Sequence, residues 1–446
     1  MTLSWGLLGP GSLRRERRTR TLGLSASVRL FNELAVPGLG GVWFGKQLVL
    51  ATLGVKVASA ASRRGRILTN IEVANAIEAL ACCMDFRESG WQTDPRLRGV
   101  NKLRSQESLE FRFARQPRFY VTQPMRMTTV EALPALGLVR ASGARFNTFQ
   151  CTEAGELLIE AACADWRPHR RTVADHLVRW ATSLNDERVD TESLRMALSP
   201  TRPLPKRAGA LLMERLISGS GSEMEDARQR RRDALAWVEG VRTSCTVNPT
   251  WDQRPAHISS PQHWADLRAG ARFAAARNAA HAVLDALEVS MASSASGSRR
   301  GLHEPIPNSV ERAIQALRGH ATRFLDERHT DHESNVFCRE CYQGDNVQVL
   351  KSLISRDDRI LRLRGNYVVP GPAFDESGAR PTDGIEESQG VDVQPGTGWL
   401  NWPGDISFRI HNLFLLNADL RGYLDHWLTT AGSKPEVHEV LVEEAV

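Results

Sequence analysis

Apolar residues recur three or four positions apart along most of the chain, which is the spacing of one face of a helix. The clearest case covers residues 70–86, where Val73, Ile77 and Leu80 share a face and Asn70 can cap the first turn. The same spacing predicts further helices at 223–241, 260–290, 309–328, 346–355 and 406–428. We therefore expect a mainly α, multidomain helical protein with small β-hairpins, in the α+β class.

Alternating, strand-like patterns are short. Leu109 to Phe113 alternates, and residues 119–121 are its predicted partner after a turn. Residues 361–369 predict a second hairpin, because Gly365-Asn366 supplies a two-residue turn between strands. These hairpins would add small sheets to the helical domains.

The most informative stretch, Thr128 to Cys163, predicts the order helix, hairpin, helix. Its hairpin turns at Ala141 to Ala144, and Phe146 and Phe149 mark the second strand. Thr152 suits the N-cap of the closing helix. The stretch thus predicts a small unit that mixes both types of element.

This order of elements resembles the wing half of a winged helix-turn-helix domain. In that family the helix before the hairpin lies in the DNA major groove, so the resemblance implies nucleic acid as a partner. The corresponding helix here is Thr129–Leu136, and Pro134 departs from the pattern because proline removes a helical backbone bond. Arg140 and Arg145 flank the turn and are candidate phosphate contacts. Proteins with this fold also serve as protein-docking modules, and a unit that binds nothing is a further interpretation.

Charge adds a second signal for nucleic acid. The formal net charge is +5, and the basic residues are almost all arginine, which forms bidentate contacts to phosphate. A GC-rich genome would produce the same bias. The N-terminal arm carries five arginines against one glutamate: Arg14, Arg15, Arg17, Arg18 and Arg20. This arm is either solvated or in contact with phosphate, and a second arginine run at 228–232 is expected to form a solvated helix face.

Four residues in one short segment have the donor atoms that zinc prefers: His329, His332, Cys338 and Cys341. Together they would complete a tetrahedral structural zinc site, with a nearby carboxylate bonded to a ligating imidazole. Four protein ligands leave no position for a water molecule, which argues against catalysis there. The alternative is an exposed loop with incidental histidines and packed cysteines.

The sequence contains no GxSxG, HExxH or glycine-rich dinucleotide motif, so an enzyme is not favoured. Gly40 to Lys46 matches GxxxxGK, but Gln47 follows where a P-loop needs serine or threonine, and we interpret the match as chance. The apolar stretch Leu34 to Ala61 is interrupted by Lys46 and Lys56, which predicts a loop and a buried helix rather than a membrane span. The first residues lack the order of a signal peptide, so we expect a cytoplasmic protein with reduced thiols and no membrane partner.

These patterns predict five segments. They are 1–100 with the basic arm and helices, 101–170 with the winged-helix-like unit, 171–291 as an arginine-rich helical domain, 292–308 as a linker, and 309–446 as an α+β domain with the cysteine–histidine cluster.

The hypothesis that fits these observations is a non-catalytic, DNA-associated subunit of a larger bacterial assembly, in a phage-defence or mobile-element setting. Its partners would be nucleic acid and other protein subunits. The first alternative is a protein–protein scaffold that binds no nucleic acid, and a metal-dependent enzyme is the weaker alternative. One continuous positive surface that includes Arg140, Arg145 and the arm Arg14–Arg20 would favour the first hypothesis, whereas an exposed apolar patch would favour a scaffold.

Overall fold

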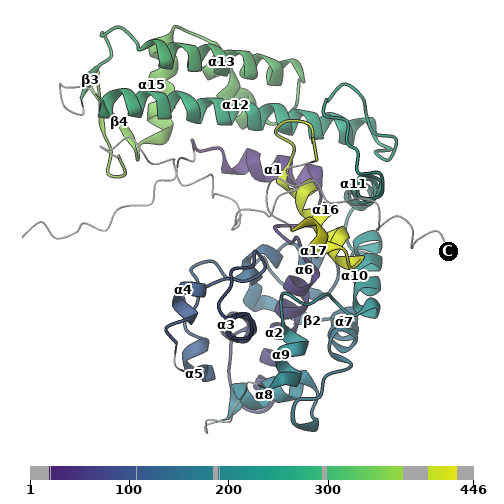
Figure 1. Ribbon diagram of the computed structural model, residues 1–446. Coiled ribbons are helices and arrows are strands. Elements are labelled where there is room, and N and C mark those ends of the chain that lie inside the picture. Colours follow the sequence, from purple (N-terminus) through teal and green to yellow (C-terminus); the bar gives the residue numbers. More distant parts are fainter. Residues whose placement is uncertain are drawn as a thin grey trace, which may run out of the picture. The chain divides into compact units, whose positions relative to one another are not determined.

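Helices form most of the protein, as the sequence predicts (Figure 1). The computed structural model describes residues 20, 22–106, 108–183, 189, 191–293, 299–374 and 400–428. The chain divides into two units, of which unit 1 comprises Met1–Arg29 and Ala269–Ser388, and unit 2 comprises Leu30–Arg268 and Gln389–Val446. The division falls inside helix α1 (Ser25–Ala35) and inside helix α12 (Pro261–Ala292).

Unit 2 is organised around helix α2 (Gly45–Arg63), which packs against helix α3 (Asn70–Glu88). Gly54 permits this close approach, because a Cβ built there would lie 2.6 Å from the Cβ of Ala74. Helices α7 (Glu153–Cys163) and α8 (Val173–Thr182) also contact α2. Most of α2 is therefore buried, which confirms the buried helix predicted from its apolar sequence.

The Thr128 to Cys163 stretch keeps its predicted hairpin and closing helix. Strand β1 (Val139–Ala141) pairs antiparallel with β2 (Phe149–Cys151), and the Thr152 side chain accepts a hydrogen bond from Gly155 N at the start of α7. Phe146, however, lies outside the second strand, in the 3-10 helix η2 (Phe146–Thr148).

The helix predicted at Thr129–Leu136 does not form as one element. In its place the chain has the 3-10 helix η1 (Met125–Thr129) and the four-residue helix α6 (Ala132–Ala135), which contains Pro134. Ala132 and Leu133 of α6 are buried. The position of a recognition helix is thus short and partly buried, and a winged-helix-like unit is not confirmed.

The strand predicted at Leu109 to Phe113 is wrong. Residues Phe111–Ala114 form the short helix α5, and no strand occurs among the described residues between 108 and 121. Phe111 packs edge-on against Trp180 at 5.2 Å between ring centroids, so a tertiary contact with α8 decides the local structure. Alternation over five residues is too short a signal to outweigh such packing.

The described part of unit 2 contains six further helices and a tryptophan-rich cluster. The helices are α4 (Val100–Leu103), α9 (Glu192–Leu198), α10 (Lys206–Ser218), α11 (Glu225–Ser244), α16 (Phe408–Leu420) and α17 (Leu424–Trp427), with the 3-10 turn η3 (Pro168–Arg170). Trp402 contacts Trp237 and Phe414 edge-on, at 5.7 and 5.9 Å between centroids. The single helix predicted at 406–428 is divided in two, with Gly422 at a positive φ of 82° between α16 and α17.

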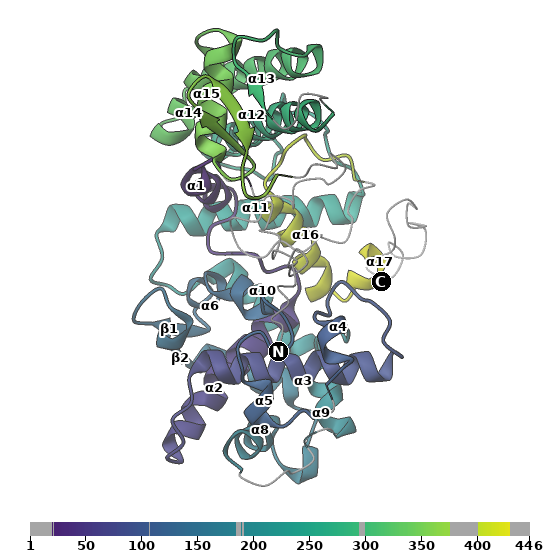
Figure 2. The ribbon, with the colours of Figure 1, turned by 90° about the vertical axis from the view of Figure 1, so that its left-hand side faces the viewer.

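Unit 1 combines the second part of α12 with three helices and a small sheet (Figure 2). The helices are α13 (Asn308–Asp326), α14 (His332–Tyr342) and α15 (Asn346–Asp357). Phe273 of α12 contacts Phe324 and Phe337 in the core. The predicted hairpin is confirmed as β4 (Leu361–Arg364) and β5 (Tyr367–Pro370), and β3 (Arg300–Gly301) completes an antiparallel sheet of order β3-β5-β4.

Candidate nucleic-acid interface

The β1–β2 hairpin presents the two arginines that the sequence selects. Arg140 lies in β1 opposite Gln150, and Arg145 directly precedes η2. Both side chains are exposed, and neither guanidinium has a hydrogen-bond or ion-pair partner within the described chain. They are therefore available to an external anion.

Local hydrogen bonds hold the tip of this hairpin. The Thr148 hydroxyl donates to the Arg145 and Gly143 carbonyl oxygens, at 2.7 and 3.1 Å. The tip thus has a defined shape without long-range contacts. Such order limits the conformational entropy lost when a ligand binds.

The base of the hairpin is attached to the N-terminus of α3. The Asn70 amide donates to the carbonyl oxygens of Phe146 and Phe149, both at 2.9 Å, and Asn147 Oδ1 accepts from Ile71 N at 2.9 Å. The sequence suggests Asn70 as a helix cap, but the structure gives the cap to Thr69. Asn70 instead fixes the hairpin relative to α3.

The turn between α2 and α3 adds arginines that the sequence interpretation missed. Arg63, Arg64 and Arg66 are exposed, and the Arg66 guanidinium has no hydrogen-bond or ion-pair partner among the described residues. Arg63 donates to Ser59 Oγ. Arg64 forms a long ion pair of 3.9 Å with Asp175, and both side chains are exposed. Arg66 precedes Asn70 by four residues, a reach of at most about 14 Å, so this turn lies close to the hairpin base. The signal was the run Arg-Arg-Gly-Arg between two predicted helices.

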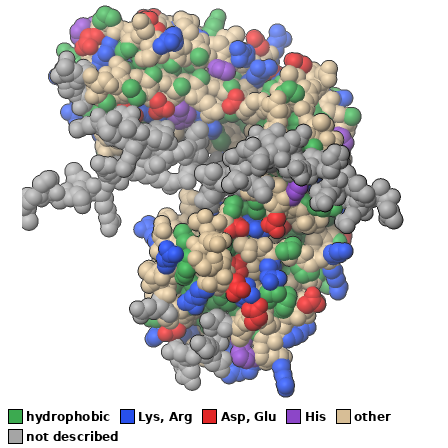
Figure 3. Space-filling view, in the orientation of Figure 1, with side chains coloured by type: hydrophobic (Ala, Val, Ile, Leu, Met, Phe, Trp, Pro, Cys, Tyr) green, Lys and Arg blue, Asp and Glu red, His purple; other side chains and the backbone are tan. Residues whose placement is uncertain are grey.

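Acidic residues limit the basic surface. Glu153, Glu156 and Glu160 are exposed on α7, the helix that follows β2, and Glu156 pairs with Lys56 at 3.0 Å. On the face shown in Figure 3, basic and acidic side chains are interspersed rather than gathered into fields of one sign.

Of the arginines in the N-terminal arm, Arg20 alone belongs to the residues that the structure describes. Arg14, Arg15, Arg17 and Arg18 lie outside the described residues. Arg20 is buried in unit 1, where it donates to Asp285 of α12 and to Glu288 at 2.9 Å, with Asp357 of α15 at 3.6 Å. A guanidinium enclosed by three carboxylates cannot contact phosphate in this arrangement, which corrects the expectation for Arg20.

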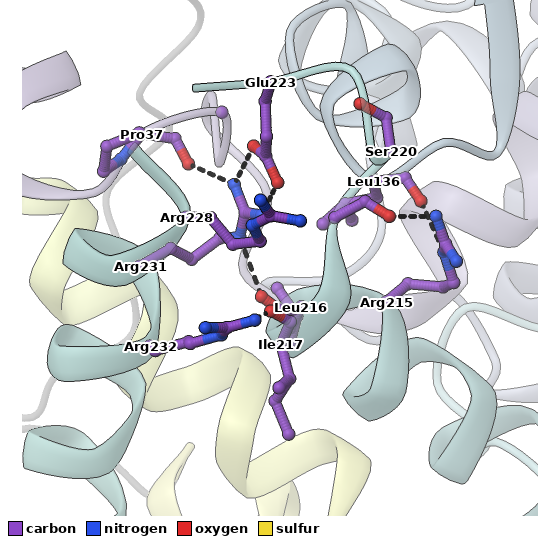
Figure 4. Close-up of polar contacts among 12 residues, drawn as sticks. Pro37, Leu136, Arg215, Leu216, Ile217, Ser220, Glu223, Arg228, Arg231 and Arg232 are labelled. Atoms are coloured by element: carbon purple, nitrogen blue, oxygen red, sulfur yellow. Dashed lines mark hydrogen bonds and ion pairs between the residues drawn. The ribbon is translucent and has the colours of Figure 1, made fainter. Parts of the chain in front are cut away.

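The arginines at 228–232 form framework contacts rather than the expected solvated face. Arg231 is fully buried and donates to Glu223 at 2.8 Å, to Leu216 O at 2.8 Å and to Pro37 O at 3.2 Å (Figure 4). Arg230 is also buried and binds Asp266 at 2.7 Å. These arginines of α11 therefore connect α11 to other segments of unit 2.

The four residues of the candidate zinc site are not brought together as a metal-binding group. Cys338 and Cys341 are buried in α14, whereas His332 is exposed at its first turn and His329 precedes the helix. Six residues of helix separate His332 from Cys338 by about 9 Å along the axis. Across the described part of the chain, no group of three or more His, Cys, Asp or Glu side chains is placed to hold a metal. The zinc site stays a prediction.

The GxxxxGK string does not form a phosphate cradle. The backbone N–H of Gly45, at the start of α2, donates to Asp419 Oδ2 at 2.7 Å. Lys46 is buried and donates to Ala197 O at 3.1 Å, and burial lowers its pKa. An internal carboxylate therefore occupies the position that a phosphate would need.

No family model, curated protein or solved structure matches this chain. None of the helices in the described ranges has the length and apolarity needed to cross a membrane.

Proposed function

We propose that the protein is a non-catalytic, nucleic-acid-associated subunit that contacts the phosphate backbone through the β1–β2 hairpin. The observation that supports this function is the pair of exposed, unpaired guanidinium groups of Arg140 and Arg145 on a hairpin that Asn70 fixes to α3. Many other arginines of the described chain are engaged with carboxylates or carbonyl oxygens, as Arg20 and Arg231 illustrate. A mildly basic chain of this kind suits weak, salt-dependent binding.

The proposed binding is sequence-independent. Base edges are read by an element that enters a groove, whereas arginines at turns contact phosphates and fix orientation. The short helix α6 precedes the hairpin where a winged-helix protein would have its recognition helix. We therefore expect duplex DNA to be the ligand without strong base preference, and other subunits of a cytoplasmic bacterial assembly to supply sequence selection and catalysis.

The test is fluorescence anisotropy of labelled duplex and single-stranded DNA across a salt series. Binding with a micromolar or lower Kd would support phosphate contacts if the logarithm of the binding constant falls linearly with the logarithm of the salt concentration. Absence of binding to both probes at low salt would reject the proposal.

A second candidate, a protein–protein scaffold, is favoured by one specific observation. Leu157 of α7 is 40% exposed and lies beside an apolar pocket. Exposed apolar surface of this kind is typical of docking sites when it forms part of a contiguous patch.

A further inference from the structure

A pocket lies beside α7 in unit 2. It has a volume of about 240 Å³ and opens between α7 and α10. Its apolar lining consists of Leu138, Ala154, Leu157, Leu158, Leu211 and Leu212. An apolar cavity of about 150 Å³ is enough for a benzene-sized group, whereas sites for drug-sized ligands have about 300–1,000 Å³. This pocket therefore fits one aliphatic side chain better than a free organic ligand.

The rim of the pocket carries negative charge toward solvent. Glu153 and Glu214 line it, both are exposed, and neither has an ion-pair or hydrogen-bond partner in the described ranges. Arg215 also lines the pocket, but its guanidinium donates to Leu136 O at 2.8 Å and to Gly219 O. Figure 4 shows this side chain directed to the Leu136 carbonyl. The matching ligand is thus an aliphatic group next to cations.

The α2–α3 turn of this chain has that chemistry. Ile67 is 92% exposed, the largest exposed fraction among the large hydrophobic residues described. Arg63, Arg64 and Arg66 are exposed beside it, and Figure 2 shows the end of α2 projecting at one edge of unit 2. The apolar surface of such an exposed isoleucine is removed from water only when a partner covers it, and this removal is favourable.

We infer that the protein associates with itself by inserting Ile67 of one copy into the α7–α10 pocket of a second copy, with the turn's arginines beside Glu153 and Glu214. The occupant is a second copy because the same chain carries both parts of the contact. The apolar knob is Ile67 with the neighbouring arginines, and the apolar hole is the α7–α10 pocket with its two carboxylates. The contact is small, so the association is weak and depends on concentration and salt. It does not rest on nucleic-acid binding, although the shared arginines make DNA a competitor.

Sedimentation velocity of the full chain tests this contact at protein concentrations from about 5 to about 500 μM. This range covers the dissociation constants expected for a small interface. The sedimentation coefficient should rise with concentration. Ile67→Ser removes the knob, Ala154→Leu fills the pocket mouth, and each should abolish the rise. Met224→Ser is the matched control, because Met224 is 78% exposed and belongs neither to the pocket lining nor to the α2–α3 turn.

A charge swap identifies the pairing. A Glu153→Arg/Glu214→Arg variant and an Arg63→Glu/Arg64→Glu/Arg66→Glu variant should each fail to self-associate, yet a mixture of the two should associate. Thermal melting of each variant checks folding, and Ile67→Ser keeps the test decisive if Ala154→Leu does not fold. A constant sedimentation coefficient for the wild type overturns the inference. So does a rise that survives Ile67→Ser, which would place the contact or its occupant elsewhere.

Discussion

The Asp419 carboxylate accepts a hydrogen bond from the backbone N–H of Gly45 at 2.7 Å, which joins α16 to the first residue of α2. Burial raises the pKa of Asp419 to about 6, while the Gly45 bond and the charges of Arg96 and Lys46 act in the opposite direction. The N-terminus of a helix favours a negative group. An internal, titratable acid thus anchors the central helix of unit 2.

This acid should make stability depend on pH. The folded-state pKa of Asp419 lies above its ordinary value of 3.8, so its contribution is fully present below about pH 4 and is lost as pH rises through about 6. The loss is on the order of 2–3 kcal/mol. Asp419→Asn keeps an acceptor oxygen for Gly45 and removes the titration. Urea unfolding at several pH values should show wild-type stability falling relative to the variant between pH 4 and 7, and a constant difference would contradict the assignment.

The buried ion pair of Arg231 and Glu223 should be essential to unit 2. Glu223→Ala leaves a fully buried guanidinium without its carboxylate, and we expect a loss of about 3–5 kcal/mol in the free energy of unfolding. Glu225→Ala on α11, the helix of Arg231, is the control, because its pairs with Arg228 and Arg232 are more exposed and should contribute about 1 kcal/mol or less. Equal losses in the two variants, measured by urea titration, would show that burial does not govern these pairs.

The predictable parts of the fold are those with strong local signals. The hairpin at β4 and β5 follows from Gly365, which adopts a φ of 58° in a two-residue turn, and the Thr152 cap follows from side-chain chemistry. The strand predicted at Leu109–Phe113 and the helix predicted at Thr129–Leu136 failed where packing on other helices and Pro134 outweighed a short pattern.

The candidate site was less predictable because arginine has two opposite uses. Arg145 and Arg20 are alike in the sequence, yet one is exposed and the other is buried among carboxylates up to 337 positions away, at Asp357. Only the tertiary structure supplies those acids. The arginines at 63–66 were visible as a run between two helices, but their closeness to the hairpin depends on the bonds of Asn70.

The thiols of α14 should be unreactive in the folded protein. Burial raises the pKa of Cys338 to about 12 and raises that of Cys341 further, so little thiolate is present near neutral pH. Iodoacetamide at pH 8 should modify both residues only after denaturation, as read by peptide mass spectrometry. Rapid native labelling would contradict this packing. Stoichiometric zinc that is lost in Cys338→Ser would instead support the predicted metal site.

The α2–α3 turn should strengthen nucleic-acid binding without adding base preference. Arg66→Ala should weaken binding to unrelated duplex sequences equally and lower the salt slope of the logarithm of the binding constant by about 0.9. Anisotropy titrations carried out in an Ile67→Ser background keep self-association out of the measurement. A loss confined to one DNA sequence would assign Arg66 to a base contact instead.

The most direct measurement compares DNA binding by Arg140→Ala/Arg145→Ala with that of the wild type across a salt series. Arg207→Ala/Arg312→Ala is the matched control, because it removes two exposed arginines from other helices and causes the same loss of net charge. The hairpin variant should bind duplex DNA about tenfold more weakly and lose about 1.8 from the salt slope, while the control keeps both values near those of the wild type. Equal binding by the hairpin variant and the control would contradict a phosphate interface at this hairpin.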